Sequence, residues 1–352
     1  MAYELIEFDK VKDKNRIIPI WKEAMGSHLD RRYEWIYNTL PLTRPTTVLL
    51  KNIESNRIVG CGSILQKIFF IDNKPFTVGI CVDFFVNAEH RTLGPAVMIQ
   101  RWITSLLQAY PIDFLFAFPN QMALSAFIRV GYKKLGTVET FVKLLKAEEK
   151  LKQYVKYSFL SKIIAFPVNK IEWIVDYFRL LAVGKKYTAE ICHEPDDRFN
   201  TLISSTINRS PIFLEKNREI LKWRFSDTPG TDNKFFCLTD ISTGKLAGYL
   251  VYSIENRVAY IQDLLLQDMD ADLKPLILFF SKEMRKEENV NSIRICYIGN
   301  SHILKNLKEL FFVKRTNDRY CLVYTRKDMP EDVKNTIFSL DKWFLLEGDM
   351  DI

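Results

Sequence analysis

The feature that most constrains the fold of this chain of 352 residues is an internal repeat of about half its length. Residues recur at two constant offsets along the sequence. The pairs 188 positions apart are Trp35 with Trp223, Pro41 with Pro229, Ile53 with Ile241 and Gly60 with Gly248, and those 180 apart are Asp83 with Asp263, Leu93 with Leu273, Pro95 with Pro275, Asn120 with Asn300 and Lys134 with Lys314. Two offsets joined by one insertion indicate a tandem duplication of one unit.

The change of offset places eight extra residues in the first copy, between Gly60 and Asp83. Residues 71–75, with the sequence Ile-Asp-Asn-Lys-Pro, predict a hairpin turn there. We therefore expect two α/β units of the same topology, in which Asp83 matches Asp263 and Asn120 matches Asn300. The predicted ranges are 1–146 for the first unit, 147–190 for a helical linker and 191–352 for the second unit.

A turn between a strand and a helix carries the clearest chemical signal in the first copy. Residues 79–86 form an apolar, strand-like run, and the apolar positions of residues 99–110 follow the spacing of one helix face. Between them, Arg91, Gly94 and Ala96 have the spacing Arg-x-x-Gly-x-Ala. Small residues at such a turn let backbone N–H groups approach a diphosphate, and the positive end of the helix stabilises its charge. Pro95 suits the first turn of a helix, where its nitrogen needs no hydrogen.

The following residues strengthen this interpretation. A second short apolar run at residues 112–118 leads to Asn120, and the helix-like segment after it ends in Gly131-Tyr132. In order and spacing, residues 55–145 resemble the GNAT superfamily of acyl-CoA N-acyltransferases. The resemblance implies an α/β (α+β) fold with two tandem GNAT-like domains, each a mixed, mostly antiparallel sheet flanked by helices.

The resemblance also implies a site for acetyl-CoA or another acyl-CoA as co-substrate. In that family the loop N–H groups bind the coenzyme A diphosphate, and the pantetheine arm pairs with the splayed strand before the loop. Carried onto this chain, the expected cofactor-binding residues are Phe84, Phe85, Val86, Arg91, Thr92, Leu93, Gly94, Pro95, Ala96, Asn120 and Phe127.

Phe127 departs from the family pattern. The position seven residues after the Asn is usually a Tyr, whose hydroxyl can protonate the departing thiolate, and Phe127 has no proton to give. Either another group or water supplies that proton, or the chain binds acyl-CoA without transferring the acyl group. As a side chain, Phe127 is expected to be a packed core residue of its helix.

The second copy has lost the loop chemistry. Lys274 stands at the position of Gly94, and Asp270 and Asp272 enter a place that would face a diphosphate. Carboxylates there would repel an anion by several kcal/mol at a low effective dielectric constant. We therefore expect the second copy to keep the fold without the cofactor.

Composition excludes several classes of protein. The six cysteines are scattered, with no Cys-x-x-Cys pair, and four histidines show no metal-ligand spacing, so we expect reduced thiols, no metal site and a cytoplasmic protein. A transmembrane helix needs about 18 consecutive uncharged, apolar residues, and no stretch of the sequence reaches this length. Residues 1–10 do not resemble a signal peptide. The net charge is +7, but the sequence has no basic cluster interleaved with aromatic residues, so binding to nucleic acid is not expected.

The segment between the copies is too apolar for a flexible tether. We expect two helices broken near Pro167 and packed against the domains. The alternative is an amphipathic surface in contact with a membrane, with its cations towards the lipid headgroups. These cations are Lys162, Lys170, Arg179, Lys185 and Lys186.

Acyl transfer to an amine requires a base near the thioester. Asp83 and Glu89 are the nearest carboxylates in sequence, and Asp83 interrupts an otherwise apolar strand, where burial could raise its pKa. The alternative is that Asp83 is a structural carboxylate that accepts N–H bonds, and the recurrence of Asp263 in the copy without the loop favours this alternative. The resemblance implies that the thioester lies against backbone N–H groups of residues 84–86, which would then stabilise the oxyanion.

The acceptor is expected in the groove between the two domains. Arg224, Asp263 and Asp349 are the polar groups predicted there, because a fixed cation would bind an anionic precursor and carboxylates an ammonium group. The string around Trp223-Arg224-Phe225 and the ending at residues 343–351 resemble tandem GNAT-like proteins associated with cell-surface polysaccharide synthesis.

These observations predict an N-acyltransferase, of N-acetyltransferase type, that acts on the amine of an amino sugar or cell-envelope precursor. Two alternatives remain open: a Fem-like aminoacyltransferase that uses aminoacyl-tRNA, and a non-catalytic acyl-CoA-binding protein. The intact diphosphate loop disfavours the Fem-like reading, because aminoacyl-tRNA needs no diphosphate cradle. The sequence leaves the oligomeric state open.

Overall fold

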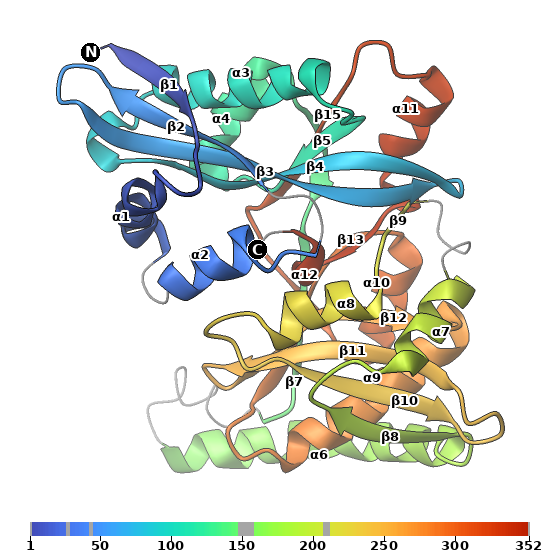
Figure 1. Cartoon of the computed structure of the whole chain (residues 1–352). Coiled ribbons are helices and arrows are strands. Elements are labelled where there is room, and N and C mark those ends of the chain that lie inside the picture. The colour runs from blue at the N-terminus through green and yellow to red at the C-terminus, as the bar shows by residue number, and fades with distance from the viewer. Residues whose placement is uncertain (1, 26–28, 42–44, 147–157, 207–211, 351–352) are drawn as a thin grey trace.

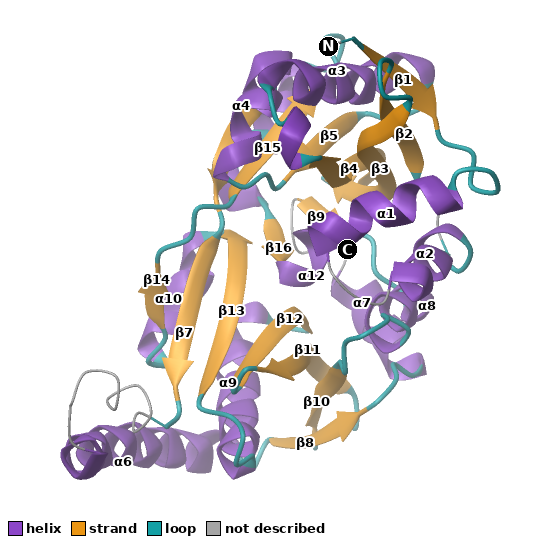
Figure 2. Cartoon of the chain, turned by 90° about the vertical axis from the view of Figure 1, so that its left-hand side faces the viewer, coloured by secondary structure: helices purple, strands orange, loops and turns teal. Residues whose placement is uncertain are grey.

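Two mixed β-sheets form the body of the protein in the computed structural model, one in the upper and one in the lower half of Figure 1. The structure describes residues 2–25, 29–41, 45–146, 158–206 and 212–350, and within these ranges the side chains of residues 24, 25 and 158–170 are not described. Helices flank both sheets (Figure 2). The expected α/β class is confirmed by the two mixed sheets and their helices.

The first sheet has the strand order β1-β2-β3-β4-β5-β15-β6, with β9 paired to β3. Its strands are antiparallel neighbours except β4 and β5, which run parallel. Their bounds are β1 Tyr3–Glu7, β2 Thr46–Asn52, β3 Arg57–Ile71, β4 Lys74–Val86, β5 Phe114–Ala117, β6 Lys133–Thr137, β9 Ile212–Leu214 and β15 Tyr320–Thr325.

The second sheet has the order β14-β7-β13-β12-β11-β10-β8, with β16 paired to β13. Read from β8 to β14, this order repeats that of the first sheet from β1 to β6. In this direction the one parallel pair is again the fourth strand with the fifth, β12 with β13. Its strands are β7 Glu139–Leu144, β8 Tyr187–Cys192, β10 Lys234–Asp240, β11 Leu246–Glu255, β12 Val258–Leu266, β13 Ser292–Gly299, β14 Val313–Arg315 and β16 Phe344–Leu346.

The two halves exchange one strand each. β15, from the second half of the sequence, lies between β5 and β6 of the first sheet. β7, from the first half, lies between β13 and β14 of the second sheet, in the matching position. The predicted ranges 1–146, 147–190 and 191–352 therefore divide the sequence, whereas each sheet takes strands from both halves.

The duplication predicted from the two offsets is visible in the hairpins. In the first copy, Gly60 pairs with Val86 and the turn follows Ile71, and in the second copy Gly248 pairs with Leu266 and the turn follows Glu255. The first hairpin is thus four residues longer on each strand, which accounts for the eight extra residues. The extra length lies at the tip of the first hairpin, where residues 69–71 pair with β9.

Helices complete each unit in the same order. Asn120 caps α4 and Asn300 caps α10, as expected for equivalent positions. The helices are α1 Lys14–Met25, α2 Leu29–Tyr37, α3 Leu93–Ala109, α4 Gln121–Val130, α6 Ser158–Val183, α7 Asp197–Thr206, α8 Arg218–Leu221, α9 Met269–Lys286, α10 Ser301–Glu309, α11 Glu331–Ile337 and α12 Glu347–Met350, with single turns η1 Ala88–His90, η2 Lys222–Ser226 and η3 Leu340–Lys342.

Two equivalent tryptophans join the halves. The rings of Trp35 in α2 and Trp223 in η2 stack with centroids 4.6 Å apart and planes 16° apart. Trp35 Nε1 donates to the Trp223 carbonyl at 2.8 Å, and Trp223 Nε1 donates to the Trp35 carbonyl at 3.1 Å. Each copy therefore makes the same bond to the other, as in an isologous interface. Both tryptophans are buried, and they hold α2 against η2.

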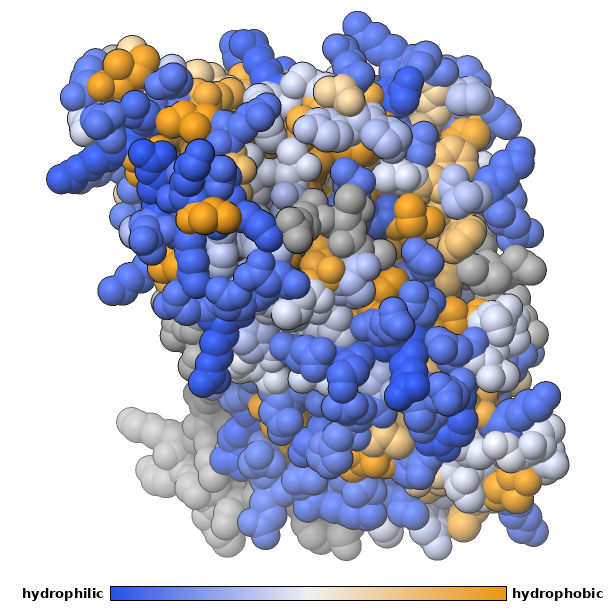
Figure 3. All heavy atoms as spheres, in the orientation of Figure 1, coloured by the Kyte–Doolittle hydropathy of each residue, from blue (hydrophilic) through white to orange (hydrophobic). Residues whose placement is uncertain are grey.

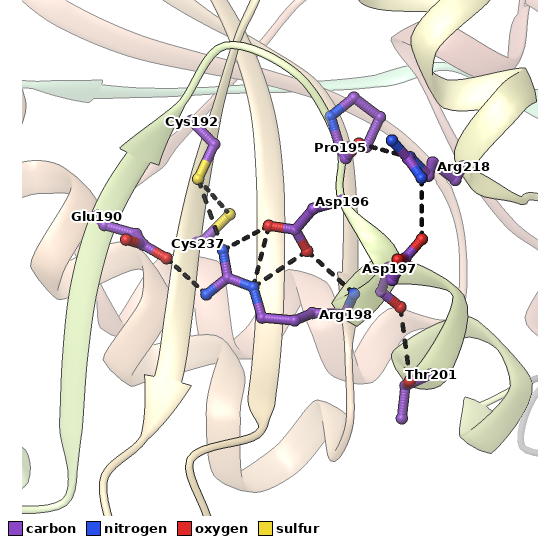
Figure 4. A network of polar contacts seen from close by, with 9 residues as sticks. All are labelled: Glu190, Cys192, Pro195, Asp196, Asp197, Arg198, Thr201, Arg218 and Cys237. Atoms are coloured by element: carbon purple, nitrogen blue, oxygen red, sulfur yellow. Dashed lines mark hydrogen bonds and ion pairs between the residues drawn. The ribbon is translucent and has the colours of Figure 1, made fainter.

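A polar network fixes the segment that carries Trp223 (Figure 4). Arg218, the first residue of α8, donates to the Pro195 carbonyl at 3.0 Å and to Asp197 at 2.9 Å, so α8 is tied to the start of α7. Arg198 links Asp196 to Glu190 of β8. These contacts hold α8, which continues directly into η2. Figure 1 shows α8 on the side of the second sheet that is turned towards the first sheet.

Helix α6 differs from its prediction. It continues through Pro167 to Val183, so the predicted break there is wrong. Its second half is anchored at Asp176, which accepts from Lys143 of β7 at 2.7 Å and from Arg285 of α9 at 2.6 Å. Such tertiary contacts can offset the about 3 kcal/mol that a proline costs inside a helix. Predicted linker residues 147–157 lie outside the described residues.

Surface hydropathy, helix length and the state of the cysteines can be compared with the expectations from composition. On the face shown in Figure 3, hydrophobic residues occur in small groups separated by hydrophilic ones. Within the described residues, none of the helices is long and apolar enough to cross a bilayer. All six cysteines are free thiols, including Cys192 and Cys237, whose sulfur atoms lie 3.7 Å apart.

The tryptophan pair predicts a strong energetic coupling between the halves. Trp35→Ala and Trp223→Ala should each lower the free energy of unfolding by about 3–5 kcal/mol, as for other buried tryptophans. The double variant should lose less than the sum by about 0.5–3 kcal/mol, because each single change already breaks the shared contact. Urea denaturation followed by circular dichroism measures this. Trp173→Ala, in an exposed tryptophan, is the control and should change stability by less than about 0.5 kcal/mol.

The strand exchange predicts that neither half folds alone. A fragment of residues 1–146 lacks β15, so β5 and β6 would lose the strand between them and expose two unpaired edges. We expect this fragment to show no cooperative thermal transition by itself and to gain one when residues 147–352 are added. A cooperative transition in the isolated fragment would contradict the exchange.

Candidate active site

A cavity of about 1180 Å³ opens between the two halves. The first half contributes the end of β4 and the starts of α3 and α4, together with Glu23, Arg32 and Trp35. The second half contributes Arg224 and Phe225 of η2, residues 228–231, and the side chains of Asn233, Glu255 and Gln262. The predicted groove therefore exists, and both copies form its walls.

The start of α3 forms one end of the cavity. Its N-cap residue Thr92 makes no side-chain capping bond, and the first N–H groups of a helix have no acceptor within the helix. The backbone N–H groups of Arg91 and Thr92 already donate to the turn at residues 88–90, and Pro95 has none, so Leu93 and Gly94 present the unused donors. A Cβ built on Gly94 would meet no atom within 4 Å. Gly94 is exposed, and Gly94 and Pro95 are not among the residues that line the cavity, whereas the predicted Arg91, Thr92, Leu93 and Ala96 are. Backbone donors and the helix dipole at this helix start suit a phosphate group.

The end of β4 forms the floor. β4 pairs with β5 only from Val78 to Ile80, so residues 81–86 diverge from β5. Phe84, Phe85 and Val86 of this free segment line the cavity, as predicted. Arg91 folds back over it, since its Nε donates to the Val86 carbonyl at 2.8 Å and its guanidinium lies 5.2 Å from the Phe85 ring centre.

Helix α4 begins at the same cavity. The Asn120 side chain accepts from the Ala123 N–H at 3.0 Å and lines the cavity, so this residue caps the helix and also borders the site. Phe127, predicted to bind the cofactor, is not among the lining residues. It is 2% exposed and packs between Phe84 and Tyr132. Phe127 is thus a core residue, in agreement with the structural reading of this position.

Asp83 occupies a β-bulge in β4. Its φ of +52° is unusual for a residue other than glycine, and the register shifts here because Cys61 pairs with Phe85 while Ser63 pairs with Val82. Bulges of this kind redirect a side chain. Here the bulge brings the buried Asp83 carboxylate to the cavity wall, beside Arg32 of α2.

The two oxygens of Asp83 have different surroundings. Oδ1 accepts from Arg32 at 2.7 Å, an ion pair in which the Asp83 side chain is 2% exposed. Oδ2 is buried and has no hydrogen-bond partner among the described residues. A buried acceptor without a donor is costly, so this atom is suited to accept a proton or hydrogen bond from a bound ligand.

Glu89, the second predicted base, lies elsewhere. It is exposed in the turn η1 and is not among the residues that line the cavity. Its proximity to the loop in sequence does not bring its side chain to the cavity. Among the described residues, no cluster of side chains suited to a metal ion is present.

In the second copy the matching helix start is closed by its own side chains. Asp268 caps α9 by accepting from the N–H groups of Asp270 and Ala271, and Asp272 accepts from the Asp268 N–H at 2.9 Å. Asp272 also accepts from the Tyr187 hydroxyl at 2.6 Å. The donors that would bind a phosphate are therefore already used, which adds a physical reason to the predicted loss of the cofactor.

In the second copy, β16 and α12 fill the gap where β12 and β13 separate. β12 pairs with β13 only up to Ile261, and β16 pairs with β13 beyond that point, at residues 297–299. α12 follows directly and lies against β12, so closely that a Cβ on Gly348 would approach the Gln262 carbonyl to 2.9 Å. The gap between the diverging strands β4 and β5 thus stays open in the first copy, whereas the matching gap between β12 and β13 is filled in the second copy.

Asp263 and Asp349, predicted to bind the acceptor, do not line the large cavity. They are buried in an internal cluster, where Lys216 makes ion pairs with both carboxylates and Tyr249 donates to Asp263 at 3.1 Å. Burial disfavours the charge on Lys216, but the two carboxylates outweigh it and raise its pKa. The cluster joins β12 to the tail and replaces the predicted contact with an acceptor.

Arg224 is the predicted acceptor residue that does line the cavity. Its Nε donates to the Gly348 carbonyl at 3.1 Å, and its guanidinium lies 5.9 Å from the Trp35 ring centre. Sequence reasoning missed Glu23, Arg32, Asn233, Glu255 and Gln262. They belong to no local motif, and only packing of the two halves brings them to one cavity.

No protein-family model matches the sequence, and no curated protein matches it significantly. Solved structures match over most of the chain at low identity. A conserved protein from Enterococcus faecalis V583, titled a probable N-acyltransferase, has a TM-score of 0.63 at 10% identity and covers 92% of this chain and 73% of its own. A tandem GNAT protein from the clavulanic acid biosynthesis pathway has a TM-score of 0.59 at 13% identity and covers 94% of this chain and 100% of its own.

Saccharomyces cerevisiae N-myristoyltransferase with bound myristoyl-CoA has a TM-score of 0.56 at 10% identity, with 92% of this chain and 82% of that chain covered. The three similar structures are thus a probable N-acyltransferase, a tandem GNAT protein and an N-myristoyltransferase. At such identities the likeness establishes the fold, which is that of two tandem GNAT-like domains.

Proposed function

We propose that this protein is an acyl-CoA N-acyltransferase whose first half binds the acyl donor. The observation that carries the proposal is the contrast between the copies: the start of α3 and the divergence of β4 open onto the large cavity, whereas both features are filled in the second copy. The acyl-CoA ligands named for the similar structures support the choice of donor.

The first half has donors suited to each part of acyl-CoA. The Leu93 and Gly94 N–H groups at the start of α3 would bind the diphosphate. The open edge of β4 at residues 84–86 would pair with the pantetheine arm and place the thioester carbonyl beside backbone N–H groups. Such preorganised donors stabilise the oxyanion that forms when a nucleophile attacks.

Asp83 is the proposed general base. Oδ2 would take a proton from the acceptor amine as its nitrogen bonds to the carbonyl carbon and the carbon–sulfur bond breaks. Arg32 holds Oδ1 at 2.7 Å and so orients the carboxylate. The thiolate would be protonated by water, because none of the residues that line the cavity is a tyrosine.

The second half would bind the acceptor. Its wall combines the cation of Arg224, the carboxylate of Glu255 and the neutral polar groups of Asn233 and Gln262. A polar amine that carries hydroxyl groups and a negative charge fits this set, and an amino sugar or cell-envelope precursor has that chemistry. We propose acetyl as the acyl group on the resemblance alone.

Phe127 favours a second candidate, acyl-CoA binding without transfer. The usual tyrosine hydroxyl is absent, and the aromatic ring at this position is packed in the core. Turnover separates the two candidates. Coenzyme A binding without loss of acyl-CoA across a broad panel of amines would favour the binding protein.

Gly94→Glu should abolish coenzyme A binding. The new side chain would enter the open space at the start of α3 and place a negative charge where the diphosphate is expected. Isothermal titration calorimetry measures the change. The matched control is Lys274→Glu at the equivalent position of α9, which removes only a surface ion pair with Glu309 and should leave affinity unchanged. Equal losses in both variants would refute the assignment.

Asp83→Asn should leave coenzyme A affinity within about twofold and lower kcat by about 10²–10⁴, the usual contribution of a general base. Glu89→Gln is the matched control and should keep full activity, because Glu89 lies outside the cavity. Acyl transfer is followed by the release of free thiol with an amine panel. If Asp83→Asn retains kcat, Asp83 is a structural carboxylate.

A further inference from the structure

The outer face of α6 is unusually apolar for a helix at the protein surface. Six large apolar side chains there are 40–65% exposed, and they make up six of the fifteen such exposed residues in the described part of the chain. They are Ile171, Trp173, Ile174, Tyr177, Phe178 and Leu181. Concentration of exposed apolar residues on one element marks an interaction surface.

In the described half of this helix, the acidic side chains face the protein interior and large apolar side chains face the solvent. Its acidic residues turn inward: Asp176 is 3% exposed between Lys143 and Arg285, and Glu172 is half-buried beside them, where burial raises its pKa. Leu180 and Val183 pack on the core from the same side. The apolar residues at 171, 174, 178 and 181 therefore point outward at helical spacing.

The exposed charges of the described second half of α6 and the turn after it are cationic. Between residues 171 and 186, the exposed charged side chains are Arg179, Lys185 and Lys186, and none is acidic. Arg179 also donates to the Glu309 carbonyl at 2.7 Å, and Lys186 lies 3.9 Å from Asp240. Trp173 and Tyr177 stack on each other with ring centres 5.6 Å apart, which presents two amphipathic rings side by side. Aromatic rings and cations together are typical of helices that lie in the headgroup region of an anionic bilayer.

We propose that α6 is a docking surface for an anionic lipid bilayer, with its axis in the plane of the membrane. Figure 2 shows α6 at the bottom of the molecule, at the end of the second sheet that lies away from the first sheet. Because the helix is held by buried ion pairs on its inner side, it need not unfold or rearrange to bind. This inference does not depend on the proposed acyl transfer. Lys162 and Lys170 lie outside the residues whose side chains are described.

Flotation of the full-length protein with vesicles tests the proposal. Binding to vesicles that contain phosphatidylglycerol is expected, with much weaker binding to pure phosphatidylcholine and with loss at high salt. Trp173 fluorescence should shift to shorter wavelength on binding. Absence of binding to both kinds of vesicle would overturn the proposal.

Variants separate the apolar and the charged contributions. Ile174→Glu and Phe178→Glu should each weaken binding at least about tenfold, because each removes one inserted apolar side chain. Lys185→Ala and Lys186→Ala should each weaken it by about fivefold. The matched control is Ile241→Glu, in an exposed isoleucine on a turn after β10, and its binding should equal that of the unchanged protein.

The competing occupant is a second copy of the chain. Sedimentation velocity in the absence of lipid should show a species that Phe178→Glu does not alter. A dimer that Phe178→Glu dissociates would identify the face as a protein interface and overturn the proposal. Circular dichroism melts check that each variant is folded.

Discussion

The stacked pair of Trp35 and Trp223 is the contact on which the arrangement of the two halves depends. Each indole N–H donates to the carbonyl of the other tryptophan, so the pair satisfies two buried donors and two acceptors at once. It holds α2 against η2, and these two segments carry Arg32 and Arg224 to the cavity. The interaction that joins the copies thus also forms the walls of the proposed site.

The copies share one topology but use it differently. In the first, a free helix start and a diverging strand are left for a ligand. In the second, Asp268 and Asp272 bond the helix start, β16 and α12 fill the gap between β12 and β13, and Lys216 ties the tail to Asp263. Polar groups that are hydrogen-bonded within the protein need no ligand, whereas polar groups without an internal partner are stabilised when a ligand binds them. The second half has therefore become a wall and a support for the first.

Local patterns predicted much of this correctly. The two offsets identified the duplication, the longer first hairpin and the equivalence of Asn120 and Asn300, because a repeated local pattern can be read directly from the sequence. Glu89 and Asp349 were proposed from proximity in sequence or from charge, and the structure places them outside the large cavity. The partners of Asp83 and Asp349 are Arg32 and Lys216, which lie 51 and 133 residues away, and no local pattern predicts such pairs.

The sequence by itself determined the α/β class, the repeat and the chemical difference between the two loops, since secondary-structure periodicity and turn residues act over a few positions. Only the tertiary structure decided which strands the halves exchange, that the tail fills the gap between β12 and β13, and that the outer face of α6 stays apolar. Each of these depends on competition between surfaces far apart in the chain. Burial and hydrogen-bond satisfaction, summed over the whole fold, resolve that competition.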